Sequence, residues 1–274
     1  MSNYDVDSIR TGYSRYDRLS SYDKVDITDE FIKTINLPVV DTYNVDNWYF
    51  KNGKYYYFKK SKGVASIINE LLAEDFYRFM GLPTVSYELI DNEDGVIIGL
   101  LSENVRKSGV IYRPCRFLNK SEQDYINRVF FDSTFECNKS FKRDLTYYVV
   151  GNYYSTLRDR YINSEIIVKE DDFEIPPLLD FESCFFEHLM EHYSDPMISF
   201  TFDSEMISSL KEENEFFLEA LDRVIEYRII DGLNRIEKKH QISIPPDIKS
   251  YYCHYNDYRK FFMENMGLLR RKTK

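Results

Sequence analysis

The first third of the chain carries strand patterns and the rest carries helix patterns, a division that limits the fold more than any other feature. Aromatic runs at 48–50 and 55–58 flank the pair Asn52-Gly53. Both residues of this pair tolerate positive φ, so the pattern is typical of a two-residue hairpin turn. We therefore predict two antiparallel strands, the second of which ends at Lys59 and Lys60.

A helix and two further strands follow this hairpin. Apolar residues recur at helical spacing from Ser66 to Met80, and Gly81 and Pro83 end the pattern. Apolar stretches at 85–90 and 96–101 read as strands around the polar turn 91–95. The sequence therefore predicts a small antiparallel sheet with one helix packed against it.

The remainder of the chain is mainly helical. Phe141, Leu145 and Val149 recur every four residues up to Leu157, which indicates a buried helix. Amphipathic segments follow at 203–238 and 247–267, and short strands are expected at 166–168 and 177–179. Together these patterns predict an α+β, two-lobed fold. Its predicted parts are a polar N-terminal arm at 1–27, a β-rich N-lobe at 28–104 and a larger, mainly helical C-lobe at 105–274.

Charge and cysteine content exclude several classes of protein. The net charge of −10 argues against direct nucleic-acid binding, which needs clustered Lys and Arg. The four cysteines are far apart and show no paired metal-ligand spacing, so we expect free thiols in a reducing compartment. No stretch approaches the ~20 apolar residues of a membrane span, and the N-terminus has no signal-peptide pattern. A cytoplasmic protein without a membrane span is expected.

Polar residues stand at five places that suit phosphoryl transfer. Lys59 ends a strand, and Glu70 follows on the next helix. Asp159 and Asn163 come just after the long buried helix, and Asp180 follows the apolar run 177–179. A transferred phosphoryl group is almost pure charge, so a protein that moves it must clamp phosphates and metal and aim the acceptor. These residue types in this order suit that task.

These motifs resemble the HipA-like and CtkA-like bacterial Ser/Thr kinases, whose fold is related to the phosphoinositide kinases. The resemblance covers roughly residues 45–190. Tyr57-Phe58-Lys59 is similar to the family's strand with the ATP lysine, and 69–73 ahead of Gly81-Leu82-Pro83 is similar to its acidic helix. Asp159-Arg160-Tyr161 resembles the catalytic loop, and 179–184 resembles the second metal-binding segment.

The resemblance implies a role for each candidate residue. Lys59 would hold the phosphates of ATP and be steadied by Glu70, and Asp159 would orient the acceptor hydroxyl. Mg²⁺ would be coordinated by Asn163 and Asp180. Adenine would lie against the segment 100–104 at the lobe junction, where the candidate residues are Leu101, Ser102 and Glu103. A protein substrate is implied, as is an antitoxin-like or regulatory partner, and a secreted effector is the alternative to a cytoplasmic protein.

The chain departs from the family pattern in the catalytic loop. Tyr161 replaces the family's His, and Asn163 lies four positions after Asp159, whereas the family spacing is five and Ser164 stands there. The run 156–158 also lacks the family's Gly-Asn. These departures leave a catalytically inactive, nucleotide-binding pseudokinase as an alternative. A lipid or small-molecule kinase would use the same residues with another acceptor.

Other interpretations of single motifs stay open. His188-Leu189-Met190-Glu191-His192 fits an inverted zinc-protease pattern, so a zinc hydrolase acting through His188 and His192 is a further alternative. Of the adjacent Lys59 and Lys60, only one can face the cleft, because side chains alternate along a strand. Glu74 and Asp75, on the same helix as Glu70, are expected to be solvated, as are the hydroxyls of the many half-buried tyrosines.

Overall fold

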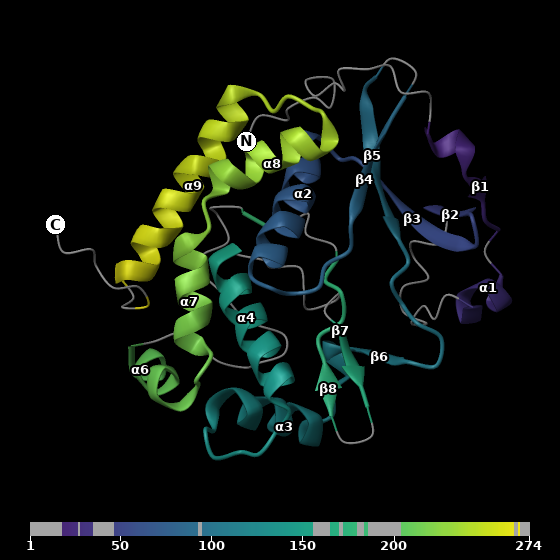
Figure 1. Ribbon diagram of the computed structural model, residues 1–274. Coiled ribbons are helices and arrows are strands. Elements are labelled where there is room, and N and C mark those ends of the chain that lie inside the picture. Colours follow the sequence, from purple (N-terminus) through teal and green to yellow (C-terminus); the bar gives the residue numbers. More distant parts are fainter. Residues whose placement is uncertain are drawn as a thin grey trace.

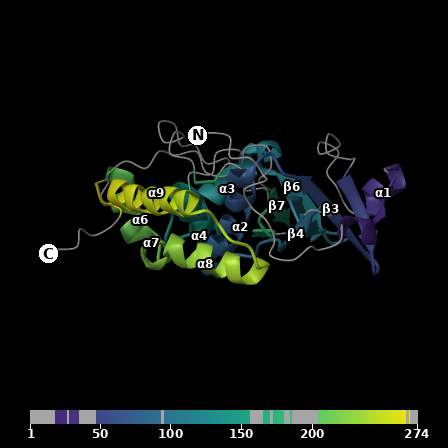
Figure 2. The ribbon, with the colours of Figure 1, turned by 90° about the horizontal axis from the view of Figure 1, so that it is seen from above.

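The computed structural model describes residues 18–26, 28–34, 47–92, 95–155, 165–169, 172–179, 184–185, 204–265 and 268. A five-stranded antiparallel sheet lies at one end of the molecule and a group of helices at the other, with α2 and α4 between them (Figures 1 and 2). The predicted α+β architecture, a small antiparallel sheet with one helix and a mainly helical remainder, is therefore confirmed.

The first sheet contains the predicted hairpin. Its strand order is β1-β2-β3-β5-β4. The strands are β1 (Asp23–Lys24), β2 (Trp48–Lys51), β3 (Lys54–Lys60), β4 (Tyr87–Asp91) and β5 (Ile97–Glu103). Asn52 and Gly53 connect β2 to β3 with φ values of 52° and 79°, as the turn requires. The polar arm adds β1, which pairs with β2 at the edge of the sheet.

A second, three-stranded sheet has the order β6-β7-β8. Its strands are β6 (Ile111–Pro114), β7 (Glu165–Val168) and β8 (Phe173–Glu174). The strand expected at 177–179 was wrong, because β8 takes its place beside β7. Leu178 instead forms a parallel bridge with Thr84, and its backbone bonds to Pro83 and Val85 at 2.9 Å each. The segment ahead of Asp180 therefore lies against the connection that follows α2.

The helices form most of the remaining structure. They are α1 (Asp29–Thr34), α2 (Val64–Phe79), α3 (Lys120–Phe131), α4 (Lys139–Ser155), α6 (Ser204–Glu213), α7 (Phe217–Glu226), α8 (Ile229–His240) and α9 (Pro246–Asn265), with short 3₁₀ turns at Arg18–Ser21 and Cys115–Phe117. The single amphipathic segment expected at 203–238 is three helices. The chain turns at Asn214, whose side chain accepts from the Phe216 N–H at 3.1 Å, and it is extended again at Tyr227 and Arg228. None of the described helices has the length and hydropathy to cross a bilayer.

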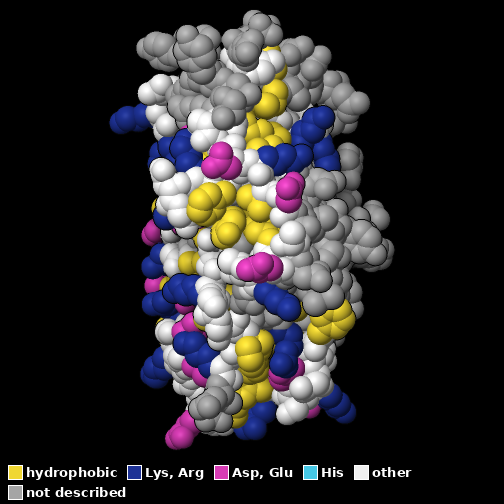
Figure 3. All heavy atoms as spheres, turned by 90° about the vertical axis from the view of Figure 1, so that its right-hand side faces the viewer, with side chains coloured by type: hydrophobic (Ala, Val, Ile, Leu, Met, Phe, Trp, Pro, Cys, Tyr) yellow, Lys and Arg dark blue, Asp and Glu magenta, His cyan; other side chains and the backbone are white. Residues whose placement is uncertain are grey.

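Helix α2 is the centre of the core. Ile67, Ile68, Leu72 and Phe76 on this helix are completely buried. It packs against α8 and α4, and it connects the sheet to the helical part. All four cysteines are free thiols, as expected. On the face shown in Figure 3, hydrophobic side chains lie in separate groups among Lys, Arg, Asp and Glu, so the described residues form no continuous basic field there.

Candidate functional site

Lys59 on β3 and Glu70 on α2 form an ion pair between sheet and helix. The lysine Nζ contacts the glutamate Oε1. The Glu70 side chain is completely buried, whereas 19% of the Lys59 side chain is exposed. Side chains alternate along a strand, so Lys60 points the other way and is exposed. Lys59 is therefore the one of the two lysines that faces α2.

The ion pair leaves part of the Lys59 side chain exposed to solvent. A carboxylate as buried as that of Glu70 is costly unless a cation and hydrogen bonds compensate its lost hydration. The ammonium of Lys59 supplies that charge, and 19% of the lysine side chain stays exposed. A lysine held in this way can bind an additional anion, such as a phosphate oxygen, without having to be ordered by that anion first.

Helix α2 is held from its other side by an ion pair to α8. The Arg235 guanidinium contacts the Asp75 carboxylate at 2.8 and 2.7 Å, and the Tyr227 hydroxyl donates to the same carboxylate at 2.9 Å. Burial and the nearby Asp75 charge raise the pKa of Tyr227 well above its usual value, so this hydroxyl stays protonated and donating. The expectation that Asp75 is merely solvated was therefore wrong.

Two further contacts fix the same helix. Glu74, also expected to be solvated, is buried, with its carboxylate 2.7 Å from the Lys239 ammonium of α8. The Tyr252 hydroxyl of α9 donates to the Asn69 side chain at 2.6 Å. Asn69 immediately precedes Glu70, so the position of Glu70 is set by residues far along the chain. Sequence periodicity cannot reveal such partners.

The end of β5 presents alternate side chains to opposite faces. Cross-strand partners share a face, and Lys59 is opposite Leu100 whereas Phe58 is opposite Leu101. Leu101 accordingly packs with Phe58, away from Lys59. The Glu103 carboxylate pairs with Lys54 at 2.8 Å on that same far face. A ligand on the Lys59 face would meet the side chain of Ser102, and only backbone groups of Leu101 and Glu103.

A buried ion pair connects the chain after β5 to the start of β7, and sequence reasoning missed it. The Arg106 guanidinium lies 2.6 Å from the Glu165 carboxylate, and each side chain is 8% exposed. Arg106 also lies 5.6 Å from the centre of the Tyr112 ring. The only sequence signal is that each of the two charged residues stands next to an apolar strand pattern, which is too common to single out this pair.

Five predicted residues lie outside the described residues: Asp159, Asn163, Asp180, His188 and His192. Their predicted roles stay predictions. Among the residues that the structure describes, no group of three or more His, Cys, Asp or Glu is placed to hold a metal ion.

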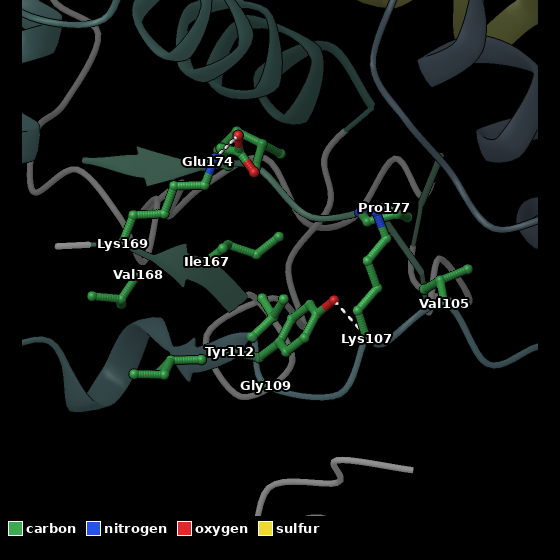
Figure 4. A pocket seen from close by; sticks show the side chains of 12 residues that line it. Val105, Lys107, Gly109, Tyr112, Ile167, Val168, Lys169, Glu174 and Pro177 are labelled. Carbon is green, nitrogen blue, oxygen red and sulfur yellow. Dashed lines mark hydrogen bonds and ion pairs between the residues drawn. The ribbon is translucent and has the colours of Figure 1, made fainter. Parts of the chain in front are cut away.

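A groove of about 700 Å³ lies between the chain after β5 and the second sheet (Figure 4). Its floor is a cross-strand row of Tyr112, Ile167 and Glu174. The Tyr112 hydroxyl accepts from the backbone N–H of Lys107 at 3.0 Å at one end of the groove. Of the predicted site residues that the structure describes, neither Lys59 and Glu70 nor the adenine candidates at 101–103 line this groove.

Several solved structures resemble this one. The Helicobacter pylori proinflammatory kinase CtkA matches with a TM-score of 0.53 and 13% identity, over 78% of this chain and 89% of that chain. A chain of the Shewanella oneidensis toxin–antitoxin complex of HipA, HipB and operator DNA matches with a TM-score of 0.50 and 13% identity, over 89% of this chain and 71% of that chain. No protein-family model and no curated protein matches the sequence.

At this level of identity the likeness concerns the fold. The chain has a kinase-like fold of the HipA and CtkA type, which is the fold that the resemblance in its sequence predicted. The ion pair of Lys59 and Glu70 lies in the N-terminal part of this chain. It connects strand β3 of the five-stranded sheet to helix α2.

Proposed function

We propose that this chain transfers the γ-phosphoryl group of ATP to a Ser or Thr hydroxyl of another protein. The observation that carries the proposal is the ion pair of Lys59 with the buried Glu70. It places a partly exposed lysine side chain between sheet and helix in a kinase-like fold. The net charge of −10 makes such a fixed cation distinctive, because a phosphate is attracted to it rather than to the acidic surroundings.

Each candidate residue has one task in this proposal. Lys59 binds the α- and β-phosphates, and Glu70 keeps its ammonium in place. Asp159 orients the acceptor hydroxyl and takes up its proton as the new P–O bond forms and the bond to the leaving ADP breaks. Asn163 and Asp180 hold Mg²⁺, which, when bound, neutralises charge on the phosphates.

Adenine lies at the end of β5 in this proposal. The side chains of Leu100 and Ser102 face the same side as Lys59 and would contact the base. Backbone groups at Leu101 and Glu103 would hydrogen-bond to its edge, since their side chains face the other way. Leu100 and Ser102 both belong to the segment 100–104 at which the sequence already placed adenine.

The donor set suits ATP and Mg²⁺. A lysine whose side chain is 19% exposed suits a phosphate oxygen, and oxygen ligands from Asp and Asn are those that Mg²⁺ prefers. We further propose a cytoplasmic location, which four free thiols fit. An antitoxin-like or regulatory partner and a secreted role stay predictions from the resemblance.

Phosphate transfer from radiolabelled ATP tests the proposal directly. Purified protein is incubated with labelled ATP, Mg²⁺ and a mixed protein acceptor such as casein, and the label incorporated into protein is measured. The intact mass of the purified protein is also measured, to detect phosphoryl groups added to the protein itself. We expect transfer by the wild type and strong loss in Asp159→Ala and Asp180→Ala. Asp222→Ala, which removes an exposed carboxylate of α7, is the matched control and should transfer like the wild type.

The same experiment separates the alternatives. ATP binding with no transfer above the Asp159→Ala level would overturn the kinase proposal and favour the pseudokinase, which the shifted Asn163 already suggests. Transfer to a lipid or small molecule but to no protein would change the acceptor class. Stoichiometric zinc by elemental analysis would favour a hydrolase acting through His188 and His192.

A further inference from the structure

The end of α4 and the backbone at Phe185 are joined by one hydrogen bond. The Phe185 N–H donates to the Ser155 carbonyl at 2.7 Å. Ser155 is the last residue of α4 and precedes Asp159 by four positions, whereas Phe185 follows Asp180 by five. The two segments that the proposed function assigns to catalysis and metal binding therefore share an anchor point within the described part of the chain.

Phe185 has a backbone conformation that its own side chain disfavours. Its φ is 61°, in the left-handed region where a Cβ atom costs roughly 1–2 kcal/mol. The ring is completely buried and packs against the rings of Phe76 and Tyr255, with centroids 6.2 and 5.5 Å away. Such a conformation persists only where the surroundings hold the residue, so packing fixes this end of the anchor.

Helix α9 donates hydrogen bonds to both ends of the anchor from one face. Tyr251, Tyr255 and Arg259 follow one another at four-residue spacing, so they share that face. The Tyr251 hydroxyl donates to the Phe185 carbonyl at 3.0 Å. The Tyr255 hydroxyl donates to the Tyr154 carbonyl at 2.7 Å.

The third residue of this face is a buried arginine at the C-terminal end of α4. The Arg259 guanidinium donates to the carbonyl oxygens of Tyr153 and Tyr154, from Nε at 3.1 Å in the second case. Carbonyls in the last turn of a helix have no donor within the helix, and a cation there is favourable. Arg259 is 2% exposed and lies 5.2 Å from the ring centres of Tyr153 and Phe262.

Helix α2, which carries Glu70, contacts the same turn of α4. The Tyr77 hydroxyl donates to the Asn152 side-chain oxygen at 2.6 Å and lies 2.9 Å from the Ser155 hydroxyl. The end of α4 is thus held by α9 from one side and by α2 from the other. This arrangement connects the lysine–glutamate pair to the start of the segment with Asp159.

We propose that Tyr251, Tyr255 and Arg259 form a positioning brace that sets the relative placement of Asp159 and Asp180. The inference rests on the proposed phosphoryl transfer. A methionine could fill the space of Arg259 without the desolvation cost of a buried guanidinium. We infer that the arginine serves through its directed hydrogen bonds, which fix the orientation of the last carbonyl groups of α4. The three are positioning residues, because they act through the backbone at the anchor.

The test compares two adjacent cations on α9. Arg259→Met removes the donor at the end of α4. Lys260→Met is the matched control, because the Lys260 ammonium binds the Ile225 and Tyr227 carbonyls, at 2.7 and 2.8 Å, at the end of α7. We expect Arg259→Met to lower kcat about 10- to 100-fold with KM for ATP changed less than about threefold, since small misplacements of catalytic groups have such effects. Arg259→Lys should recover part of kcat, and Lys260→Met should leave kcat within about twofold of wild type.

Amide hydrogen exchange supplies a readout that needs no activity. Exchange at the Phe185 amide should accelerate at least about tenfold in Arg259→Met and in the milder Tyr251→Phe, but not in Lys260→Met. If the wild type transfers no phosphate, the proposed function fails, and exchange at Phe185 alone then decides whether the brace exists. Equal loss of kcat in the Arg259 and Lys260 variants, or unchanged exchange at Phe185, would overturn the brace.

Discussion

Gly232 lets α8 approach α2 closely, and replacing it by alanine tests whether this approach matters. A Cβ atom there would lie 2.4 Å from the Tyr227 hydroxyl oxygen, 2.8 Å from a carboxylate oxygen of Asp75 and 3.1 Å from a methyl of Leu72. The first distance is about 1 Å shorter than an ordinary van der Waals contact. Tyr227 is completely buried with its ring 5.0 Å from that of Phe76, so its hydroxyl cannot simply swing away.

Two effects of opposite sign decide the outcome of Gly232→Ala. Alanine in a helix interior is favoured over glycine by about 1 kcal/mol. Overpacking of a filled core costs about 1–3 kcal/mol, and loss of the buried Tyr227–Asp75 hydrogen bond adds about 1–3 kcal/mol. Crowding therefore outweighs helix propensity, and we expect the free energy of unfolding to fall by roughly 1–5 kcal/mol.

Equilibrium unfolding in urea measures this difference. Asn234→Ala is the matched control, because Asn234 is exposed on the same helix and gains propensity without crowding. That variant should be unchanged or more stable by about 0.5 kcal/mol. A Gly232→Ala protein as stable as the wild type, or more stable, would refute the reasoning that α8 and α2 are in tight contact here.

Two further outcomes are expected. Arg106→Met should lower the free energy of unfolding by about 3–5 kcal/mol, because it removes the cation from a buried carboxylate at Glu165, and a urea-measured loss below about 1 kcal/mol would contradict this. High pH should destabilise the protein, because burial raises the pKa of three tyrosines above 10.0 in the folded state while the unfolded chain ionises near pH 10. Their stabilising contribution is complete below about pH 10 and falls above it by roughly 1.4 kcal/mol per pH unit for each. If absorbance showed all 24 tyrosines of the folded protein titrating near pH 10, with none later, the prediction would be contradicted. The three are Tyr154, Tyr227 and Tyr252.

Local patterns predicted the parts of this fold that depend on local chemistry. The turn at Asn52 and Gly53 needs positive φ at both residues, so the sequence alone identifies the hairpin. The pairing of Lys59 with Glu70 was inferred because a strand-end lysine and a helix glutamate occur in the order that the kinase families use. Long helices were identified because their apolar residues recur at the helical spacing, which is a local pattern.

Short and polar elements were beyond such reasoning. Strands β1 and β8 have two residues each, which is too few for a period to appear. The turn at Asn214 uses a local bond from the Phe216 N–H, but the Asn214 side chain also donates to Phe130 and Thr146, which lie far away in sequence and which no local pattern records.

Buried polar groups were also missed, since their partners lie far away in sequence. Glu74 belongs to a helix whose apolar residues were recognised, yet its partner Lys239 comes 165 positions later. The tyrosine hydroxyls of α4 and α9 were expected to be wet, but Tyr255 and Tyr252 donate inside the core. Composition shows that such rings will be buried but does not show what their hydroxyls bind.

Binding of a fluorescent ATP analogue to Lys59→Met and Lys60→Met tests the central claim most directly. The two lysines are adjacent, but only Lys59 is paired with Glu70, whereas Lys60 is exposed. We predict that Lys59→Met weakens binding at least about tenfold, the effect of losing one charge-assisted phosphate contact, while Lys60→Met binds like the wild type. Equal affinities for the two variants, or no binding by the wild type, would contradict the account.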